Sequence, residues 1–199
     1  RDCLLSRGLG DVYKRQLLMR MGVNFTKQIV DCLYTGISTD TGCFRYTNTT
    51  ADTFRIAASL VELGCNSAYI NKVMFETKSK EKIMLEREVY DTITYCANEK
   101  CAIVWVTLDM LKSLNIGEDE IEGLASIPRQ IEGVLIGITM KEKEGGFFKI
   151  SVRTNGNIDA AKFCSRFGGG GHKAAAGCSV NGSLEDVRSQ LIKAAEETL

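Results

Sequence analysis

The sequence predicts an α/β fold, with helices in the first half of the chain and a mixed sheet in the second. Apolar residues recur at helical spacing between Thr26 and Cys96. Two short apolar runs rich in β-formers, Ala102–Val106 and Gly133–Ile138, have the length and composition of buried strands. Residues 147–153 alternate between apolar and polar side chains, as a strand with one buried face does.

The first expected helix begins after an N-cap at Thr26. Gly36 is a stop signal, with an end at Ile37 as the alternative, and either end would place Asp40 in the turn after the helix. Phe44 and Tyr46 then alternate like a short strand. The apolar face of the helix would be formed by Ile29, Val30, Leu33 and Tyr34.

Three further helices are expected before the strands. The first is capped by Thr49 or Thr50 and ends at Gly64, with an apolar face of Phe54, Ala57, Ala58 and Val61. Ser67 opens a shorter helix. Ser79 opens a longer helix, whose rows of lysine and glutamate fit a solvent-facing helix that links two domains. Its apolar positions are Leu85, Val89, Thr92 or Ile93, and Cys96.

In the second half, residues 108–114 suit a short helix, and residues 116–127 an acidic loop with one helical turn before Pro128. Gly145-Gly146 indicates a hairpin. Asn157 would cap a helix that reaches Phe167. A strand through Cys178 and Val180 and a helix from Ser183 then close the chain.

Composition limits the classes of ligand. The 199 residues are 44% hydrophobic and 25% charged, and 25 lysines and arginines balance 25 acidic residues. Without a global positive field, long duplex nucleic acid is not an expected partner, whereas a short anionic ligand at a local site is. No apolar run has the length of a membrane span and no secretion signal precedes the fold, so a cytoplasmic location is expected.

The eight cysteines are expected to be free thiols. None of them forms a C-x-x-C pair, so the pattern does not indicate a zinc site. Several fall at apolar positions of the expected helices and strands, where cysteine acts as a small apolar residue. A reducing compartment would keep such thiols unpaired.

The stretch from Phe167 to Gly177 is the strongest candidate for a binding site. Four glycines, Gly168–Gly171, run into the only histidine of the chain, His172. Glycines let a ligand approach the backbone, and successive N–H groups can point at one anion. Read alone, the run could equally be a flexible loop beside a surface histidine.

Two other places carry side chains suited to phosphate chemistry. Ser151 and Arg153 share one face of the expected strand, and Arg153 offers a planar fork for a phosphate or a base. An ordinary solvated strand face is the alternative. Asp40 lies between threonines beside Gly42; such an aspartate commonly caps a turn, but its carboxylate also suits magnesium or manganese.

Together the segments Tyr34–Thr50 and Phe167–Gly177 resemble the DHH phosphoesterase family, in particular the bacterial nanoRNases that degrade very short RNAs and 3′-phosphoadenosine 5′-phosphate. The resemblance extends from about Leu17 to the C-terminus. It implies that Asp40 is a manganese ligand. It also implies that the phosphate and sugar end of the substrate is held by Arg153 and by the loop residues Gly169, Gly170, Gly171 and His172. Ser151, on the strand face of Arg153, is a further candidate for substrate binding.

The resemblance implies hydrolysis of phosphoesters by two manganese ions, with magnesium as an alternative. The family takes its metal ligands from several motifs, one of which has two adjacent histidines. This chain has a single histidine, and of the metal set only Asp40 remains. We therefore expect the chain to be the C-terminal part of such an enzyme and to be inactive by itself.

The expected domain boundaries follow from these segments. Leu9–Gln16 resemble translated sequencing-adapter sequence, so residues 1–16 are expected to be a non-native leader, with a divergent native segment as the alternative. Residues 17–78 would be the C-terminal part of the catalytic domain, residues 79–97 a linker helix, and residues 98–199 the complete DHH-associated substrate-binding domain.

Two alternative functions stay open at the level of sequence. One is a cyclic-dinucleotide phosphodiesterase of the same family, because specificity pockets diverge within one scaffold. The other is an RNA-binding module without catalysis, as in the C-terminal part of alanyl-tRNA synthetases, against which the segment Thr39–Gly42 argues. The expected partner is short single-stranded RNA or a small phosphorylated nucleotide; the oligomeric state, a homodimer included, is left open.

Overall fold

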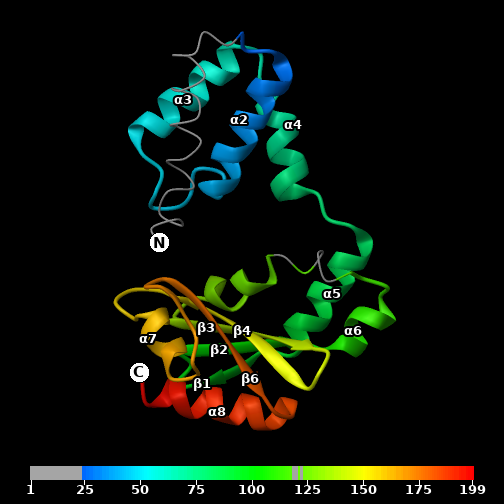
Figure 1. Cartoon of the computed structure of the whole chain (residues 1–199), viewed down its shortest axis with the longest axis vertical. Coiled ribbons are helices and arrows are strands. Elements are labelled where there is room, and N and C mark those ends of the chain that lie inside the picture. The colour runs from blue at the N-terminus through cyan, green and yellow to red at the C-terminus, as the bar shows by residue number, and fades with distance from the viewer. Residues whose placement is uncertain (1–23, 118–120, 122) are drawn as a thin grey trace. The chain divides into compact units, whose positions relative to one another are not determined.

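The computed structural model describes residues 24–117, 121 and 123–199, so the leader expected at residues 1–16 lies outside the described residues. The chain divides between Thr77 and Lys78 into two compact units, each with its own core. Figure 1 shows helices in the first unit and a sheet with helices in the second. Within the described residues, no helix combines the length and the apolar character needed to cross a membrane.

The N-terminal unit is helical, and its caps are those that the sequence indicates. The Thr26 hydroxyl accepts a hydrogen bond from the Ile29 N–H at 3.4 Å, and Thr50 and Thr53 cap the next helix reciprocally. The elements in chain order are α2 (Lys27–Asp40), α3 (Ala51–Glu62), α4 (Ser67–Asn71) and the π-helical turn η1 (Lys72–Glu76). Their core consists of Val30, Leu33, Tyr34, Ile37, Ile56, Ala57, Leu60, Cys65 and Ile70.

Two expectations for this unit were wrong. Helix α2 continues past Gly36 to Asp40, because the burial of Ile37 and Ser38 offsets the cost of about 1 kcal/mol for a glycine inside a helix. Asp40 is therefore the last helical residue. No strand forms around Phe44, whose φ of 63° lies in the left-handed region and is incompatible with extended backbone.

The apolar face expected for α3 was wrong except at Ala57. Phe54 and Val61 are 55% and 45% exposed, and the buried side chains are instead Thr53, Ile56, Ala57 and Leu60. The helix carries two apolar stripes, and the one with the larger aliphatic side chains packs against α2.

The C-terminal unit is built on a six-stranded mixed sheet with the order β1-β2-β3-β4-β6-β5. Only β2 and β3 are parallel; the other neighbours are antiparallel. The strands are β1 (Thr94–Cys96), β2 (Cys101–Val106), β3 (Ile136–Lys143), β4 (Phe147–Thr154), β5 (Gly170–His172) and β6 (Ala175–Asn181). The helices are α5 (Lys80–Asp91), α6 (Leu108–Ser113), α7 (Ala160–Ser165) and α8 (Leu184–Glu196), with 3-10 turns η3 (Leu124–Ser126) and η4 (Pro128–Gln130).

One face of the sheet is covered by α7 and α8, and this is the main core of the unit. In Figure 1 α8 runs along the sheet. The alternation expected in β4 is confirmed, because Phe148, Ile150 and Val152 all point into this core. Gly145 and Gly146, with φ of 95° and 77°, form the expected hairpin turn between β3 and β4.

The opposite face is covered only in part. Val104 and Val106 of β2 pack against Leu85 and Val89 of α5 and against α6 and the 3-10 turns. Helix α5 thus buries the expected apolar positions Leu85 and Val89 in this unit and leaves most of its other residues exposed to solvent. The helix ends at Asp91. Thr94–Cys96, the last of which was expected on this helix, form strand β1 instead.

Two further details differ from the expectation. Cys96 lies in β1 directly opposite Cys101, not on a helix. The N-cap of α7 is Asp159, whose carboxylate accepts from the Lys162 N–H at 3.0 Å, so Asn157 precedes the helix without capping it. Ser183 caps α8 as expected.

Candidate functional site

The face of the sheet opposite α7 and α8 brings Arg153 and His172 into one cross-strand row. Arg153 of β4 pairs with Ala175 of β6, and Ala175 pairs with His172 of the edge strand β5. Residues directly opposite one another in antiparallel strands project to the same face. At about 4.8 Å per strand, Arg153 and His172 therefore stand roughly 10 Å apart, with only a methyl group between them.

The neighbouring row carries almost no side-chain bulk. Ser151 of β4 lies opposite Gly177 of β6, which lies opposite Gly170 of β5. A Cβ on Gly177 would stand 3.1 Å from the Ile150 carbonyl oxygen, whereas a Cβ on Gly170 would meet nothing. The two rows form a shallow floor that a ligand can approach down to the backbone.

The glycine run is packed against β6 and is not a free loop. A Cβ on Gly169 would lie 2.3 Å from the Gly177 carbonyl oxygen, and one on Gly171 would lie 2.6 Å from the Ala175 carbonyl oxygen. Glycine is the residue that permits this close approach of two backbones. The sequence gives no strand signal here, and β5 forms because β6 supplies its partner.

One donor expected for the phosphate is already used. The Gly169 N–H donates to the Cys164 carbonyl at the end of α7, at 3.0 Å. The idea that all N–H groups from Gly169 to Gly171 face one anion is therefore wrong for Gly169. Gly170 and Gly171 lie on the exposed edge strand.

The hairpin that carries His172 is held by hydrogen bonds to neighbouring segments. The buried Thr154 hydroxyl lies 3.0 Å from the carbonyl oxygens of both Ile158 and Lys173. The Ala160 N–H donates to the Lys173 carbonyl at 2.8 Å, and the Thr154 N–H donates to the Ala174 carbonyl at 3.2 Å. These bonds tie the turn after His172 to the end of β4 and the start of α7.

Arg153 and two thiols define the local electrostatics. The half-buried Arg153 guanidinium donates to the Val152 carbonyl at 3.1 Å and is one of the cations on this face. Beneath the glycine run, the contact with the Cys178 thiol, followed by burial, raises the pKa of Cys164. Cys164 is consequently protonated at neutral pH and acts as an apolar support.

Asp40 lies in the other unit, at the C-terminal end of α2. The turn after it is held by the Thr41 hydroxyl, which donates to the Ile37 carbonyl at 2.7 Å and accepts from the Phe44 N–H at 3.1 Å. Asn48 Nδ2 donates to the Asp40 carbonyl at 3.0 Å. Gly42 is needed in this turn, since its φ is 56° and a Cβ would lie 2.3 Å from the ring of Tyr46.

The described residues do not form a metal centre by themselves. Among them, no three or more histidine, cysteine, aspartate and glutamate side chains gather in a way that could hold an ion. Asp40 is thus a single carboxylate. It belongs to a different compact unit from Ser151, Arg153 and His172.

Sequence reasoning missed one cation of the uncovered face. Lys149 precedes Ser151 by two residues and therefore projects from β4 to the same side as Ser151 and Arg153. The same period-two alternation that selected Ser151 and Arg153 could have identified it.

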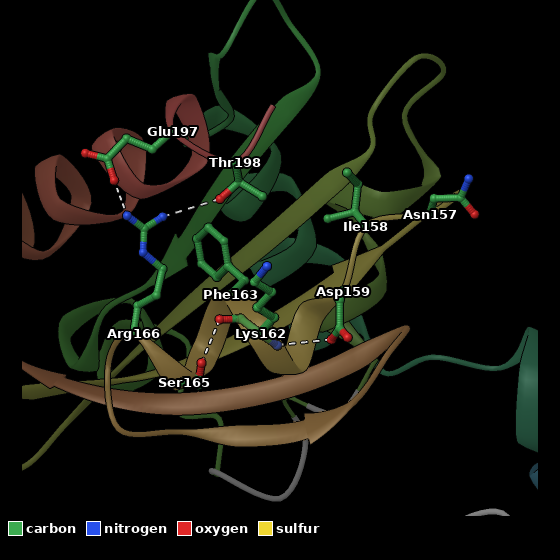
Figure 2. A pocket seen from close by; sticks show the side chains of 9 residues that line it. All are labelled: Asn157, Ile158, Asp159, Lys162, Phe163, Ser165, Arg166, Glu197 and Thr198. Atoms are coloured by element: carbon green, nitrogen blue, oxygen red, sulfur yellow. Dashed lines mark hydrogen bonds and ion pairs between the residues drawn. The ribbon is translucent and has the colours of Figure 1, made fainter.

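A separate pocket of about 680 Å³ lies between α7 and the end of α8 (Figure 2). Arg166 donates to the Ala194 carbonyl at 3.0 Å and also pairs with Glu197, which together fix the C-terminus of α8. None of the residues selected from the sequence lines this pocket, whose walls are Asn157, Ile158, Asp159, Lys162, Phe163, Ser165, Arg166, Glu197 and Thr198.

Known proteins resemble the chain over nearly its whole length. The bifunctional oligoribonuclease and PAP phosphatase NrnA of Thermus thermophilus is 29% identical over 187 residues, which cover 93% of this chain and 55% of that protein. The Bacillus subtilis protein of the same name is 24% identical over 159 residues, or 80% of this chain and 50% of that protein.

Among solved structures, an exopolyphosphatase-related protein from Bacteroides fragilis superposes with a TM-score of 0.81 at 26% identity. The match covers 92% of this chain and 55% of that one, so the chain spans about half the length of the relatives it matches. Residues 98–199, half of the chain, match the DHHA1 domain. The chain therefore belongs to the DHHA1 domain family and resembles DHH-family nanoRNases in sequence.

Proposed function

We propose that this chain is part of a phosphoesterase that hydrolyses very short oligoribonucleotides, 3′-phosphoadenosine 5′-phosphate, or both. The relatives whose names state these activities match 93% and 80% of the chain. The observation that carries the proposal is the row Arg153–Ala175–His172, in which two phosphate-binding side chains flank a floor of small residues. That arrangement suits one small anion and not an extended duplex.

In this proposal the C-terminal unit binds and orients the substrate. The Arg153 guanidinium has five N–H donors in a planar fork, a geometry that suits phosphate oxygens, and one of them donates to the Val152 carbonyl. His172 binds the same phosphate from the edge strand, and Ser151 adds a hydroxyl from the next row. Gly170 and Gly171 let the substrate lie against the backbone. Holding the phosphate in one geometry lowers the entropic part of the reaction barrier.

A divalent cation, manganese or magnesium, would polarise the phosphoryl oxygens and activate water when bound. Asp40 is proposed as one of its ligands. A carboxylate at the C-terminal end of a helix faces the negative end of the helix dipole, which a cation would compensate. One carboxylate cannot hold two cations, so the other ligands have to come from outside the described residues.

The proposal is tested by titrating the 199-residue chain with three ligands in EDTA. These are a dinucleotide with a 5′-phosphate, 3′-phosphoadenosine 5′-phosphate and a cyclic dinucleotide. Arg153→Ala is expected to weaken binding of the preferred ligand roughly tenfold or more, the range for a lost charge-assisted hydrogen bond. Lys193→Ala on α8, across the sheet, is the charge-matched control.

The outcomes separate the candidate functions. Preference for the first two ligands supports the proposal, and preference for the cyclic dinucleotide would favour a cyclic-dinucleotide phosphodiesterase. Binding that Arg153→Ala and His172→Gln leave unchanged would remove the phosphate-binding row altogether.

A further inference from the structure

The uncovered face continues along β4 beyond Ser151. Lys149 is exposed and, in the part of the chain that the structure describes, has no ion-pair or hydrogen-bond partner. Its cross-strand neighbours are Lys141 on β3 and Ser179 on β6. The Lys141 ammonium donates to the Ile121 carbonyl at 3.3 Å, whereas the Lys149 side chain is exposed to solvent.

Lys149 is too far along the strand to belong to the row of Arg153. The two positions are four residue steps apart along β4, which is about 13 Å at 3.3 Å per residue. Both side chains rise from the same face, with the small residues Ser151 and Gly177 between them. Two cations at this spacing meet two different phosphates of one extended anion more readily than a single phosphate.

An aromatic side chain, Phe147, lies next to Lys149 on the same face of β4. Phe147 is the first residue of β4, and by alternation it lies on the face of Lys149 and not on the core face of Phe148. It is only partly buried, and its cross-strand neighbours are Lys143 and Asn181. An aromatic side chain among polar ones on an open sheet face is a place where a nucleobase can stack.

We propose that Lys149 and Phe147 form a second binding site for single-stranded oligonucleotide, in which Lys149 holds a backbone phosphate and Phe147 stacks a base one or more nucleotides away from the phosphate at Arg153. This inference rests on the proposed function, because the row Arg153–Ala175–His172 anchors one end of the ligand. In their described parts, β3, β4, β5 and β6 place no acidic side chain on this face, which suits a polyanion. The consequence is a preference for oligonucleotides longer than two residues over mononucleotides.

The test compares unlabelled RNAs of two and five nucleotides, each with a 5′-phosphate, by calorimetric titration of the 199-residue chain in EDTA. Wild-type protein should bind the pentanucleotide at least about fivefold more tightly than the dinucleotide. Lys149→Ala should weaken the pentanucleotide about fivefold and leave the dinucleotide within about twofold. It should also lower the slope of log affinity against log salt for the pentanucleotide by about 0.7, the value for one lost phosphate contact on a single strand.

Phe147→Leu keeps the apolar volume while removing the ring, and it should weaken the pentanucleotide alone. Lys193→Ala on α8 removes the same charge on the other side of the sheet and should change neither affinity. If circular dichroism shows that Phe147→Leu unfolds the chain, the affinities of the Lys149→Ala variant alone test the second site, because Lys149 is exposed.

Four results would overturn this second site. The pentanucleotide could bind no more tightly than the dinucleotide, or Lys149→Ala could weaken both lengths equally. Lys193→Ala could weaken the pentanucleotide as much as Lys149→Ala does, which would indicate general charge attraction. Any of these three results would still agree with phosphate binding at the row Arg153–Ala175–His172, provided that Arg153→Ala weakens binding of the dinucleotide. Binding of neither RNA would reject both the row and the second site.

Discussion

Ala175 lies directly between Arg153 and His172 in the cross-strand row, and its methyl group is the only side chain that separates them. A bulky residue at this position would fill the space above the floor without disturbing the core, because the buried side chains of β6 are its neighbours Ala176 and Cys178. The row can therefore be blocked with the fold intact.

Ala175→Leu is expected to weaken binding of a 5′-phosphorylated dinucleotide roughly tenfold or more, by excluding the phosphate from Arg153 and His172. Unfolding by heat should change little. Ser179→Leu, an exposed position on the same strand, is the matched control and should leave dinucleotide binding near wild type. Equal effects of the two variants would show that the row is not where the phosphate sits.

Alanine is expected to destabilise the protein at Gly169 and to change its stability little at Gly170. A Cβ at Gly169 would lie 2.3 Å from the Gly177 carbonyl oxygen and 2.4 Å from the Cys178 Cβ, while at Gly170 the space is open. Gly169→Ala should lower the free energy of unfolding by about 1–3 kcal/mol, the usual cost of overpacking. Gly170→Ala should change it by less than about 0.5 kcal/mol. Urea denaturation measures both, and a Gly169→Ala protein of wild-type stability would contradict the packing of β5 on β6.

The elements that sequence predicted well are those specified by local chemistry. Thr26, Thr50 and Ser183 cap their helices because a hydroxyl satisfies free N–H groups wherever it stands at a helix start. The alternation in β4 and the Gly145-Gly146 turn likewise depend on neighbours in sequence. Such signals depend little on distant parts of the chain, although the stop signal at Gly36 was overridden by the burial of Ile37 and Ser38.

The elements that sequence missed depend on partners far along the chain. The buried stripe of α3 is decided by its contact with α2, and Phe54 and Val61 were the wrong choice for that reason. Strand β5 has no β-forming residue and exists only through its register with β6. At the site, alternation placed Ser151 and Arg153 on one face, but only the strand order β4-β6-β5 brings His172 into the row of Arg153.

The cysteines are expected to differ sharply in reactivity. Burial, followed by the charge of Asp31, raises the pKa of Cys65 to about 11, whereas Cys32 is exposed. At pH 8 iodoacetamide should modify Cys32 quickly and Cys65 slowly, since the thiolate is the reactive form. Mass spectrometry of digested protein over time measures both rates, and equal rates would contradict the burial of Cys65.

The raised pKa of Cys65 also predicts how the stability of the fold depends on pH. The folded protein holds the Cys65 proton up to a pH of about 11, whereas the thiol of an unfolded chain ionises near 8.5. The stabilisation is therefore complete below the unfolded value and is lost as pH rises toward 11. Cys65→Ser, with an unionised hydroxyl in place of the thiol, should flatten the fall in stability between pH 9 and pH 11 that urea denaturation would record in the parent chain.

The last prediction concerns Asp40 and the division of labour between binding and hydrolysis. The 199-residue chain should bind short nucleotides through the Arg153 row yet show no phosphodiesterase activity with manganese, because its described residues offer no metal cluster. In a hydrolytically active form of the protein, Asp40→Asn should lower kcat strongly and KM little, since the lost charge acts on the transition state. Arg153→Ala should mainly raise KM. A kcat for Asp40→Asn within about twofold of the parent would make Asp40 a turn residue. Turnover by the purified 199-residue chain itself, at rates that survive repeated purification, would show that its own residues complete the catalytic site.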